Sequence, residues 1–226
     1  MTFSIKDKTV LEKFLSDVLA ANINGLSSMD ELLSLTNPDS RALLDMIIGL
    51  DPYKYGFKGE LVPQEPTPTN VVKIKKDTIN QGGEYELDSS AYLPKQVFDA
   101  FSSMAESFHA ENPNRELLVG SGYRSPAFQI VILLYIFVRV YDFDIAVTLR
   151  RVALPQYSQH CSVSNTAIDL VNVDGEPTDE NPTKFKDTIE YEWLLTYANQ
   201  YGFYESYPLN NPEGIMWEPW HWQYRG

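Results

Sequence analysis

The last eleven residues of the chain, MWEPWHWQYRG, place Glu218 three positions before His221 among three tryptophans and a tyrosine. A histidine can bind a metal ion or move a proton, and a carboxylate can act as a general base. On a regular strand residues three apart point to opposite faces, but Pro219 interrupts the strand and would allow both to face one point. Taken alone, this segment also fits an aromatic core strand that includes a Glu and a His incidentally.

A second histidine and another carboxylate come earlier. Asp169 lies in the predicted strand 166–173, TAIDLVNV, where its neighbours are apolar. Burying a bare carboxylate costs several kcal/mol unless it is paired or bound to a metal, although an Asp at a strand end that accepts backbone hydrogen bonds is an equal alternative. His160, Asp169 and His221 together would be a catalytic zinc set, with three protein ligands and a position for water. Glu218 would then be the base.

The segment GSGYRSPAFQ, residues 120–129, supplies a cation. Its glycines allow a tight turn after a strand, and the planar guanidinium of Arg124 can hold a carboxylate through two hydrogen bonds. By itself this residue also fits a surface arginine in a loop. His109, on an amphipathic helix, is assigned to the surface. Cys161 beside His160 is discounted as a nucleophile, because the partners in such dyads usually come from distant segments.

In order and wording these segments resemble the zinc D-Ala-D-Ala carboxypeptidase family, which includes vancomycin-resistance D,D-carboxypeptidases, D,D-dipeptidases and L-alanyl-D-glutamate endopeptidases. The family pattern is SGYRS…Q, then Ser-x-His-x-x-Gly-x-Ala-x-Asp, then Glu-x-x-His, often as EPWHW.Y.G. Here SGYRSPAFQ, SQHCSVSNTAID, YGFYESYP and EPWHWQYRG carry the resemblance, over about residues 85–226. The middle motif has two additional residues between His160 and Asp169, and Val163 stands at the glycine position. A two-residue insertion between the two ligands is tolerable if the loop bulges outward.

The resemblance implies one Zn²⁺ per chain, held by His160, Asp169 and His221. It implies Glu218 as general base and then proton donor to the leaving amine, and Arg124 as partner of the oxyanion or of the substrate carboxylate. The substrate-binding residues it implies are Ser158, Gln129, Tyr123 and Ser125. Trp220 and Trp222 are expected to support the ligands from behind.

Composition limits the other classes of function. The net charge of −13 argues against nucleic-acid binding, and we expect no membrane span because the longest apolar run, residues 130–138, is too short. One cysteine excludes an internal disulfide and a cysteine-rich metal site. The first residues do not read as a secretion signal. We therefore expect either an extracytoplasmic, wall-associated protein whose export signal is absent from this sequence, or a cytoplasmic one.

The pattern of apolar residues and breakers predicts an α+β fold: a small mixed or antiparallel sheet flanked by helices, with a zinc site, after a helical N-terminal segment. The expected division is a helical region 1–60, a proline-rich linker and lead-in 61–80, and a catalytic domain 81–226. Helices are predicted at 28–35 after the cap Ser28 and at 10–20, 37–49, 93–112, 128–150 and 188–203, the last closed by Gly202. Strands are predicted at 116–125, where the strand runs into a glycine-containing turn, at 166–173 and in the final aromatic segment.

The expected function is a zinc D-alanyl-D-alanine carboxypeptidase acting on peptidoglycan stem peptides or other peptides that end in D-Ala-D-Ala. Two alternatives stay open. One is an L,D-endopeptidase or a D,D-dipeptidase with the same motifs. The other is a catalytically decayed module that binds the cell wall.

Overall fold

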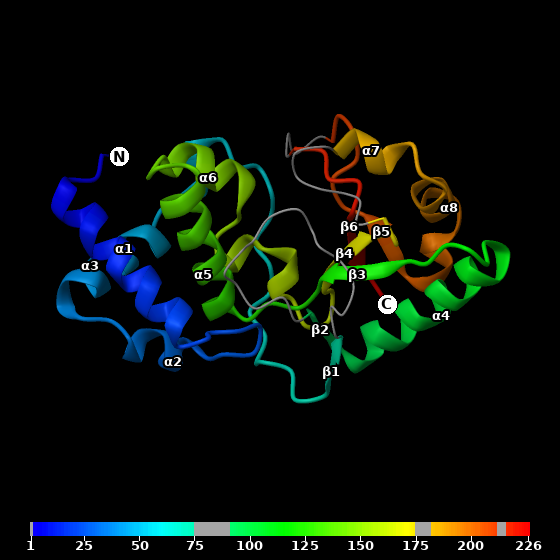
Figure 1. Cartoon of the computed structure of the whole chain (residues 1–226), viewed down its shortest axis with the longest axis horizontal. Coiled ribbons are helices and arrows are strands. Elements are labelled where there is room, and N and C mark those ends of the chain that lie inside the picture. The colour runs from blue at the N-terminus through cyan, green and yellow to red at the C-terminus, as the bar shows by residue number, and fades with distance from the viewer. Residues whose placement is uncertain (1, 75–90, 175–181, 212–215) are drawn as a thin grey trace.

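The computed structural model describes residues 2–74, 91–174, 182–211 and 216–226. It confirms the expected α+β class, with small antiparallel sheets flanked by helices. Figure 1 shows two groups of elements side by side, one made only of helices and one built around a sheet. The first group contains the N-terminal helices, and the second contains the C-terminus.

The N-terminal helices are α1 (Ile5–Ala20), α2 (Met29–Ser34) and α3 (Pro38–Ile48), followed by the short helix η1 (Pro52–Tyr55). Each of the three begins at a capping box, in which a polar side chain accepts from the third helical amide; the cap residues are Ser4, Ser28 and Asn37. Such boxes satisfy amides that a helix end leaves unpaired. Because Ser4 is a cap, α1 begins five residues before the predicted start at residue 10.

The predicted continuous helix 128–150 is wrong. The structure instead has α5 (Pro126–Tyr135), a π-helical turn η2 (Ile136–Val140) and α6 (Ile145–Arg151). Asp142 and Phe143 adopt φ values of 42° and 64°, which no helix can continue through. Asp144 then starts α6 by accepting from the amides of Ala146 and Val147.

The main sheet has the strand order β3-β4-β6-β5, and all its pairs are antiparallel. Its strands are β3 (Leu118–Ser121), β4 (Ala167–Val171), β5 (Phe203–Glu205) and β6 (His221–Tyr224). In the register Asp169 faces His221 on one neighbour and Ser121 on the other. Since directly opposed side chains share a face of the sheet, all three lie on one face.

A second, two-stranded sheet pairs β1 (Val71–Ile74) with β2 (Ala91–Pro94). Strand β2 leads directly into α4 (Lys95–Glu111), so the predicted helix began two residues too early. Between β4 and β5 the chain forms α7 (Pro182–Lys186), α8 (Ile189–Tyr197) and η5 (Ala198–Tyr201). Gly202 at φ 80° ends this run, inside the predicted helical range 188–203.

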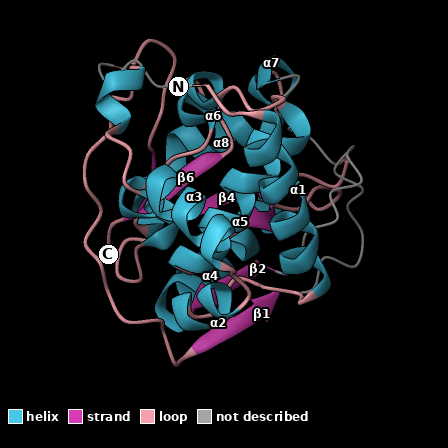
Figure 2. Ribbon diagram, turned by 90° about the vertical axis from the view of Figure 1, so that its left-hand side faces the viewer, coloured by secondary structure: helices cyan, strands magenta, loops and turns pink. Residues whose placement is uncertain are grey.

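Each of the two groups has its own apolar core. One joins α1, α2 and α3 to α5, η2 and α6, and the other joins α4 and α8 to the main sheet. Figure 2 shows the first group in front, with the strands behind it. The N-terminal helices therefore bury the apolar α5 helix. The domain boundaries at 60 and 80 stay a prediction, and residues 75–90 lie outside the described part of the chain.

Residues 57–70 contain no helix or strand, as the prolines predicted. In the described ranges, no helix combines the length and the apolar character that a membrane crossing requires.

Gly122 offers a test of how tightly the motif loop packs. A Cβ at this position would lie 2.5 Å from the carbonyl oxygen of Tyr92, which is too close for any side chain. We expect Gly122→Ala to lower the free energy of unfolding by about 1–3 kcal/mol, as overpacking does. Urea denaturation measures the loss. Ser103→Ala, on the exposed face of α4, is the control and should change stability little; equal stabilities would contradict the described packing.

Candidate active site

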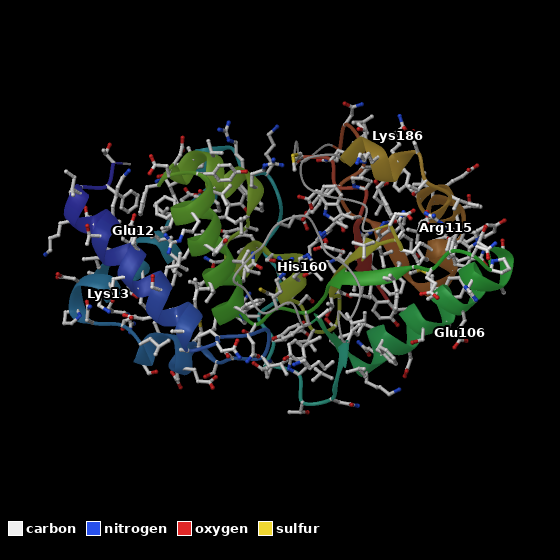
Figure 3. The ribbon with its side chains drawn as sticks, in the orientation of Figure 1. Glu12, Lys13, Glu106, Arg115, His160 and Lys186 are labelled. Carbon is white, nitrogen blue, oxygen red and sulfur yellow. The ribbon has the colours of Figure 1, made fainter. Side chains whose placement is uncertain are left out.

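The three predicted metal ligands come together from two neighbouring strands and a short helix. Asp169 on β4 and His221 at the start of β6 are paired in the sheet register. His160 lies in the 3-10 helix η4 (Gln159–Cys161), which precedes β4. Figure 3 places His160 near the middle of the molecule, between the N-terminal helices and the sheet. One ligand atom from each residue lies within 4.8 Å of the other two.

The atoms that approach one another are a nitrogen of each imidazole and the two carboxylate oxygens of Asp169. His160 Nε2 is 3.3 Å from Asp169 Oδ2, and His221 Nδ1 is 3.0 Å from Asp169 Oδ1. The two imidazole rings are 4.8 Å apart and nearly perpendicular. Ligand atoms around a tetrahedral zinc with bonds of about 2.0–2.1 Å are separated by about 3.4 Å. The donor set and its spacing therefore fit zinc.

In each ring the nitrogen that faces away from Asp169 already has a hydrogen-bond partner. His160 Nδ1 is 2.8 Å from the carbonyl oxygen of Gly122, and His221 Nε2 is 3.1 Å from Gln159 Oε1. Both partners are acceptors, so each far nitrogen must carry the proton. In the neutral rings the near nitrogens are then bare lone pairs that face a carboxylate. Two acceptors at this distance need a proton or a metal ion between them, which is the chemical reason that this site suits a metal.

The electrostatics favour the forms that bind metal. Burial lowers the pKa of His160 to about 4, with the Arg124 charge adding to the effect, so this ring is neutral at pH 7. Burial acts to raise the pKa of Asp169, but the positive charge and N–H donation that His160 or His221 supplies when its ring is protonated outweigh burial and hold this pKa well below the usual range. A neutral imidazole and an ionised carboxylate are the states that ligate zinc.

Glu218 lies at the edge of this cluster. A turn closed by the amide of His221 and the carbonyl of Glu218 brings the two residues together, as Pro219 suggested. Glu218 Oε2 is 3.8 Å from His221 Nδ1, the atom that faces Asp169. Its side chain is 19% exposed, whereas those of His160 and His221 are 6% and 5% exposed. Glu218 is thus placed where water reaches the site.

Arg124 points its guanidinium into the same cluster. Nη2 donates to Asp169 Oδ2 at 3.2 Å and to Ser121 Oγ at 2.8 Å, and Nη1 donates to Gln129 Oε1 at 3.3 Å. The other end of the Gln129 side chain donates to the carbonyl of Ala153. The arginine is therefore fixed from two sides, and Gln129 serves as one of its supports.

The remaining predicted residues surround the cluster in different ways. Ser125 caps α5 by accepting from the Phe128 amide, and Tyr123 is buried with its amide bonded to the Tyr92 carbonyl. Trp222 is part of the core beneath the sheet. Ser158 and Trp220 are also buried. Substrate binding by Ser158, Gln129, Tyr123 and Ser125 stays a prediction. His109 is exposed on α4, as expected.

The sequence interpretation missed three contributors. Gln159 accepts from His221 Nε2 and from Ser206 Oγ, and Tyr207 stacks on the His221 ring at 4.9 Å between centroids. Ser121 holds Arg124. Gln159 sits inside a recognised motif at a variable position, so only the fold shows its partner.

Comparison with known proteins shows the family to which the chain belongs. The family model for VanY, D-alanyl-D-alanine carboxypeptidase, matches residues 90–226. The chain belongs to the VanY family. The matched range contains every predicted ligand, Glu218 and Arg124, and it confirms the resemblance seen in the motifs.

Individual relatives are more distant. A D-alanyl-D-alanine carboxypeptidase of Enterococcus faecium is 28% identical over 173 residues, which cover 73% of this chain and 48% of that protein. The chain thus spans about half the length of that curated relative. The LdcB LD-carboxypeptidase, whose structure concerns peptidoglycan recognition, is 26% identical with a TM-score of 0.56, over 76% of this chain and 77% of LdcB.

Two VanY structures are similar with lower sequence identity and lower TM-scores than LdcB. VanYB in complex with D-alanine-D-alanine is 21% identical, with a TM-score of 0.48, over 74% of this chain and 84% of that protein. A mutant of the vancomycin-resistance D,D-pentapeptidase VanY, solved in complex with Zn(II), is 21% identical with a TM-score of 0.47, over 67% of this chain and 85% of that protein.

Gln159 can be tested as the support of His221. Gln159→Ala removes the acceptor that keeps the proton on Nε2, and we expect zinc affinity to fall by about 10–100-fold, as when other such supports are lost. Competition with a chromogenic chelator measures it. Gln156→Ala, in the same segment, is the control because no hydrogen bond of its side chain is seen in the described part. Equal affinities for both variants and the wild type would exclude this role.

Proposed function

We propose that this chain is a zinc-dependent D-alanyl-D-alanine carboxypeptidase that removes the terminal D-Ala from peptidoglycan stem peptides. The observation that carries the proposal is the convergence of His160, Asp169 and His221, in which one nitrogen of each imidazole faces the Asp169 carboxylate. Family membership supports the same reaction class.

The zinc ion would be held by His160 Nε2, Asp169 and His221 Nδ1. When bound, it would polarise the scissile carbonyl and make water a better nucleophile at neutral pH. Three protein ligands would leave the ion accessible to water and substrate. Asp169 and Glu218 are 18% and 19% exposed, so we expect water and substrate to approach from their side of the cluster.

Side chains of the protein would transfer the protons and stabilise the negative charge that develops on the substrate. Glu218 takes a proton from the attacking water and later gives it to the leaving amine of D-Ala. Arg124, fixed by Ser121 and Gln129, supplies a preorganised positive charge for the oxyanion or for the substrate carboxylate. No covalent intermediate is needed, and Cys161 is buried with a pKa that burial raises to about 12. It is therefore a poor nucleophile.

An LD-carboxypeptidase is the second candidate, because LdcB is 26% identical with a TM-score of 0.56. The same ligands and base would serve either bond, as they would for an L,D-endopeptidase or a D,D-dipeptidase. The catalytically decayed module is less favoured, since ligands, base and arginine lie together. Products from defined muropeptides that end in D-Ala-D-Ala or in a single D-Ala distinguish these activities.

Metal content is the first test. We expect about one zinc per chain in the wild type after zinc dialysis and removal of excess metal, and a large loss in His160→Ala. Elemental analysis measures both. Absence of zinc in the wild type would refute the zinc enzyme and favour a binding module.

Glu218 is tested separately from the metal. Glu218→Ala removes the proposed base but none of the ligands, so turnover of a D-Ala-D-Ala peptide should fall by about 10²–10⁴-fold while zinc stays bound. Glu106→Ala is the control, because Figure 3 shows Glu106 on α4 away from His160. Turnover like that of the wild type in Glu218→Ala would rule out the role of general base.

A further inference from the structure

The loop that joins His160 to β4 is held by a side chain from a distant part of the chain. Glu65 Oε2 accepts from the amide of Val163 at 2.7 Å, from the amide of Ser164 at 3.1 Å and from the hydroxyl of Ser162 at 3.1 Å. The contacts span 97 to 99 residues of sequence. Successive amides that converge on one oxygen form a concave site for an anion, which a carboxylate fills well.

The position of this loop gives the contact its importance. It begins two residues after His160 and ends before Asp169, so it connects two of the three proposed ligands. Two hydrogen bonds lie inside the loop: the Asn165 amide donates to Ser162 Oγ, and Thr166 Oγ1 donates to the Ser162 carbonyl. Among the described residues, Glu65 is the side chain seen to tie this turn to another part of the molecule.

Glu65 belongs to an extended segment that has few other attachments. We call residues 59–66 the strap. Leu61 is 66% exposed, and Pro63 and Gln64 are exposed as well. The Val62 amide donates to the Gln156 carbonyl at 2.8 Å. A cavity of about 300 Å³ separates part of the strap from Gln159, Ser162 and Asn165. Hydrogen bonds rather than close apolar packing therefore hold the strap.

The charge of Glu65 fits its contacts. Burial acts to raise its pKa, but the amides of Ser164 and Val163 outweigh this and hold the pKa below the ordinary value for glutamate. The carboxylate is thus ionised at neutral pH, and charge-assisted bonds of this kind are stronger than neutral ones. Glu60, five residues earlier on the strap, is exposed, which makes it a matched site for comparison.

We propose that Glu65 is a positioning residue for the metal site: its carboxylate fixes the 162–164 turn and thereby sets His160 relative to Asp169. The inference rests on the proposed metal site, but the brace itself can be measured without metal. It would also explain how a loop longer than the family pattern can keep two ligands in register. Residues outside the matched range 90–226 would then contribute to metal binding.

The experiment compares Glu65→Ala and Glu65→Gln with the matched control Glu60→Gln, all in the full chain. In metal-free protein, hydrogen exchange at the Val163 and Ser164 amides should be faster in Glu65→Ala than in the wild type, and intermediate in Glu65→Gln, which keeps one acceptor. Zinc affinity should fall by about tenfold or more in Glu65→Ala. The visible spectrum of the cobalt(II)-substituted variant should shift, because the ligand geometry changes. Glu60→Gln should match the wild type throughout.

Unchanged exchange, zinc affinity and cobalt spectrum in Glu65→Ala would overturn the inference. A general loss of stability is recognised by urea denaturation, and if Glu65→Ala does not fold, Glu65→Gln gives the same comparison with the side-chain shape kept. A wild type that binds no zinc would refute the proposed function alone. In that case faster exchange at Val163 and Ser164 would still support the brace, and unchanged exchange would refute it.

Discussion

The structure around the site depends on one constraint. The carboxylate of Asp169 lies between two imidazole rings, and the other nitrogen of each ring already donates a hydrogen bond to a different acceptor. The Gly122 carbonyl and the Gln159 amide oxygen take the outward protons of His160 and His221, so the inward nitrogens present lone pairs. Three acceptors in a largely buried space cost several kcal/mol unless a cation joins them. Arg124 offsets part of this cost through its bond to Asp169, and it does so from one side only. The remaining side is where a metal ion would complete the arrangement.

This constraint accounts for the surrounding architecture. The antiparallel register of β4 and β6 brings Asp169 opposite His221, and the pairing of β3 with β4 brings Ser121 beside them to hold Arg124. Gly122 must lack a side chain because its Cα lies against the Tyr92 carbonyl, and its own carbonyl is the one that His160 needs. A shift of that loop would therefore move a ligand and a cation together. Rigid support of this kind is what a preorganised site requires.

The sequence predicted the residues that meet at the site better than it predicted what holds them. His160, Asp169, His221, Glu218 and Arg124 could be found because their side-chain chemistry and their motifs point to one reaction. Helix starts at Ser28 and Asn37 were found because capping is local. The break at Asp142 and Phe143 was missed, because left-handed residues without glycine are rare and leave little trace in composition. Gln159 and Glu65 were missed because a glutamine or glutamate has many partners open to it, and only long-range packing decides which one it takes.

The N-terminal helices and the strap are tied to both loops that form the site. The Ser125 amide, next to Arg124, donates to the Gly25 carbonyl at 2.8 Å, and Glu65 holds the turn after His160. Helix α5 follows Ser125 directly and is buried by α1 and its neighbours. A chain that began at residue 90, where the family match starts, would leave the Ser125 amide and the 162–164 turn without these partners and would expose the apolar face of α5. An unpaired amide at the buried Ser125 and uncovered apolar surface both cost free energy, so the matched region and the N-terminal region stabilise one another. The geometry of the candidate site is thus a property of the larger unit.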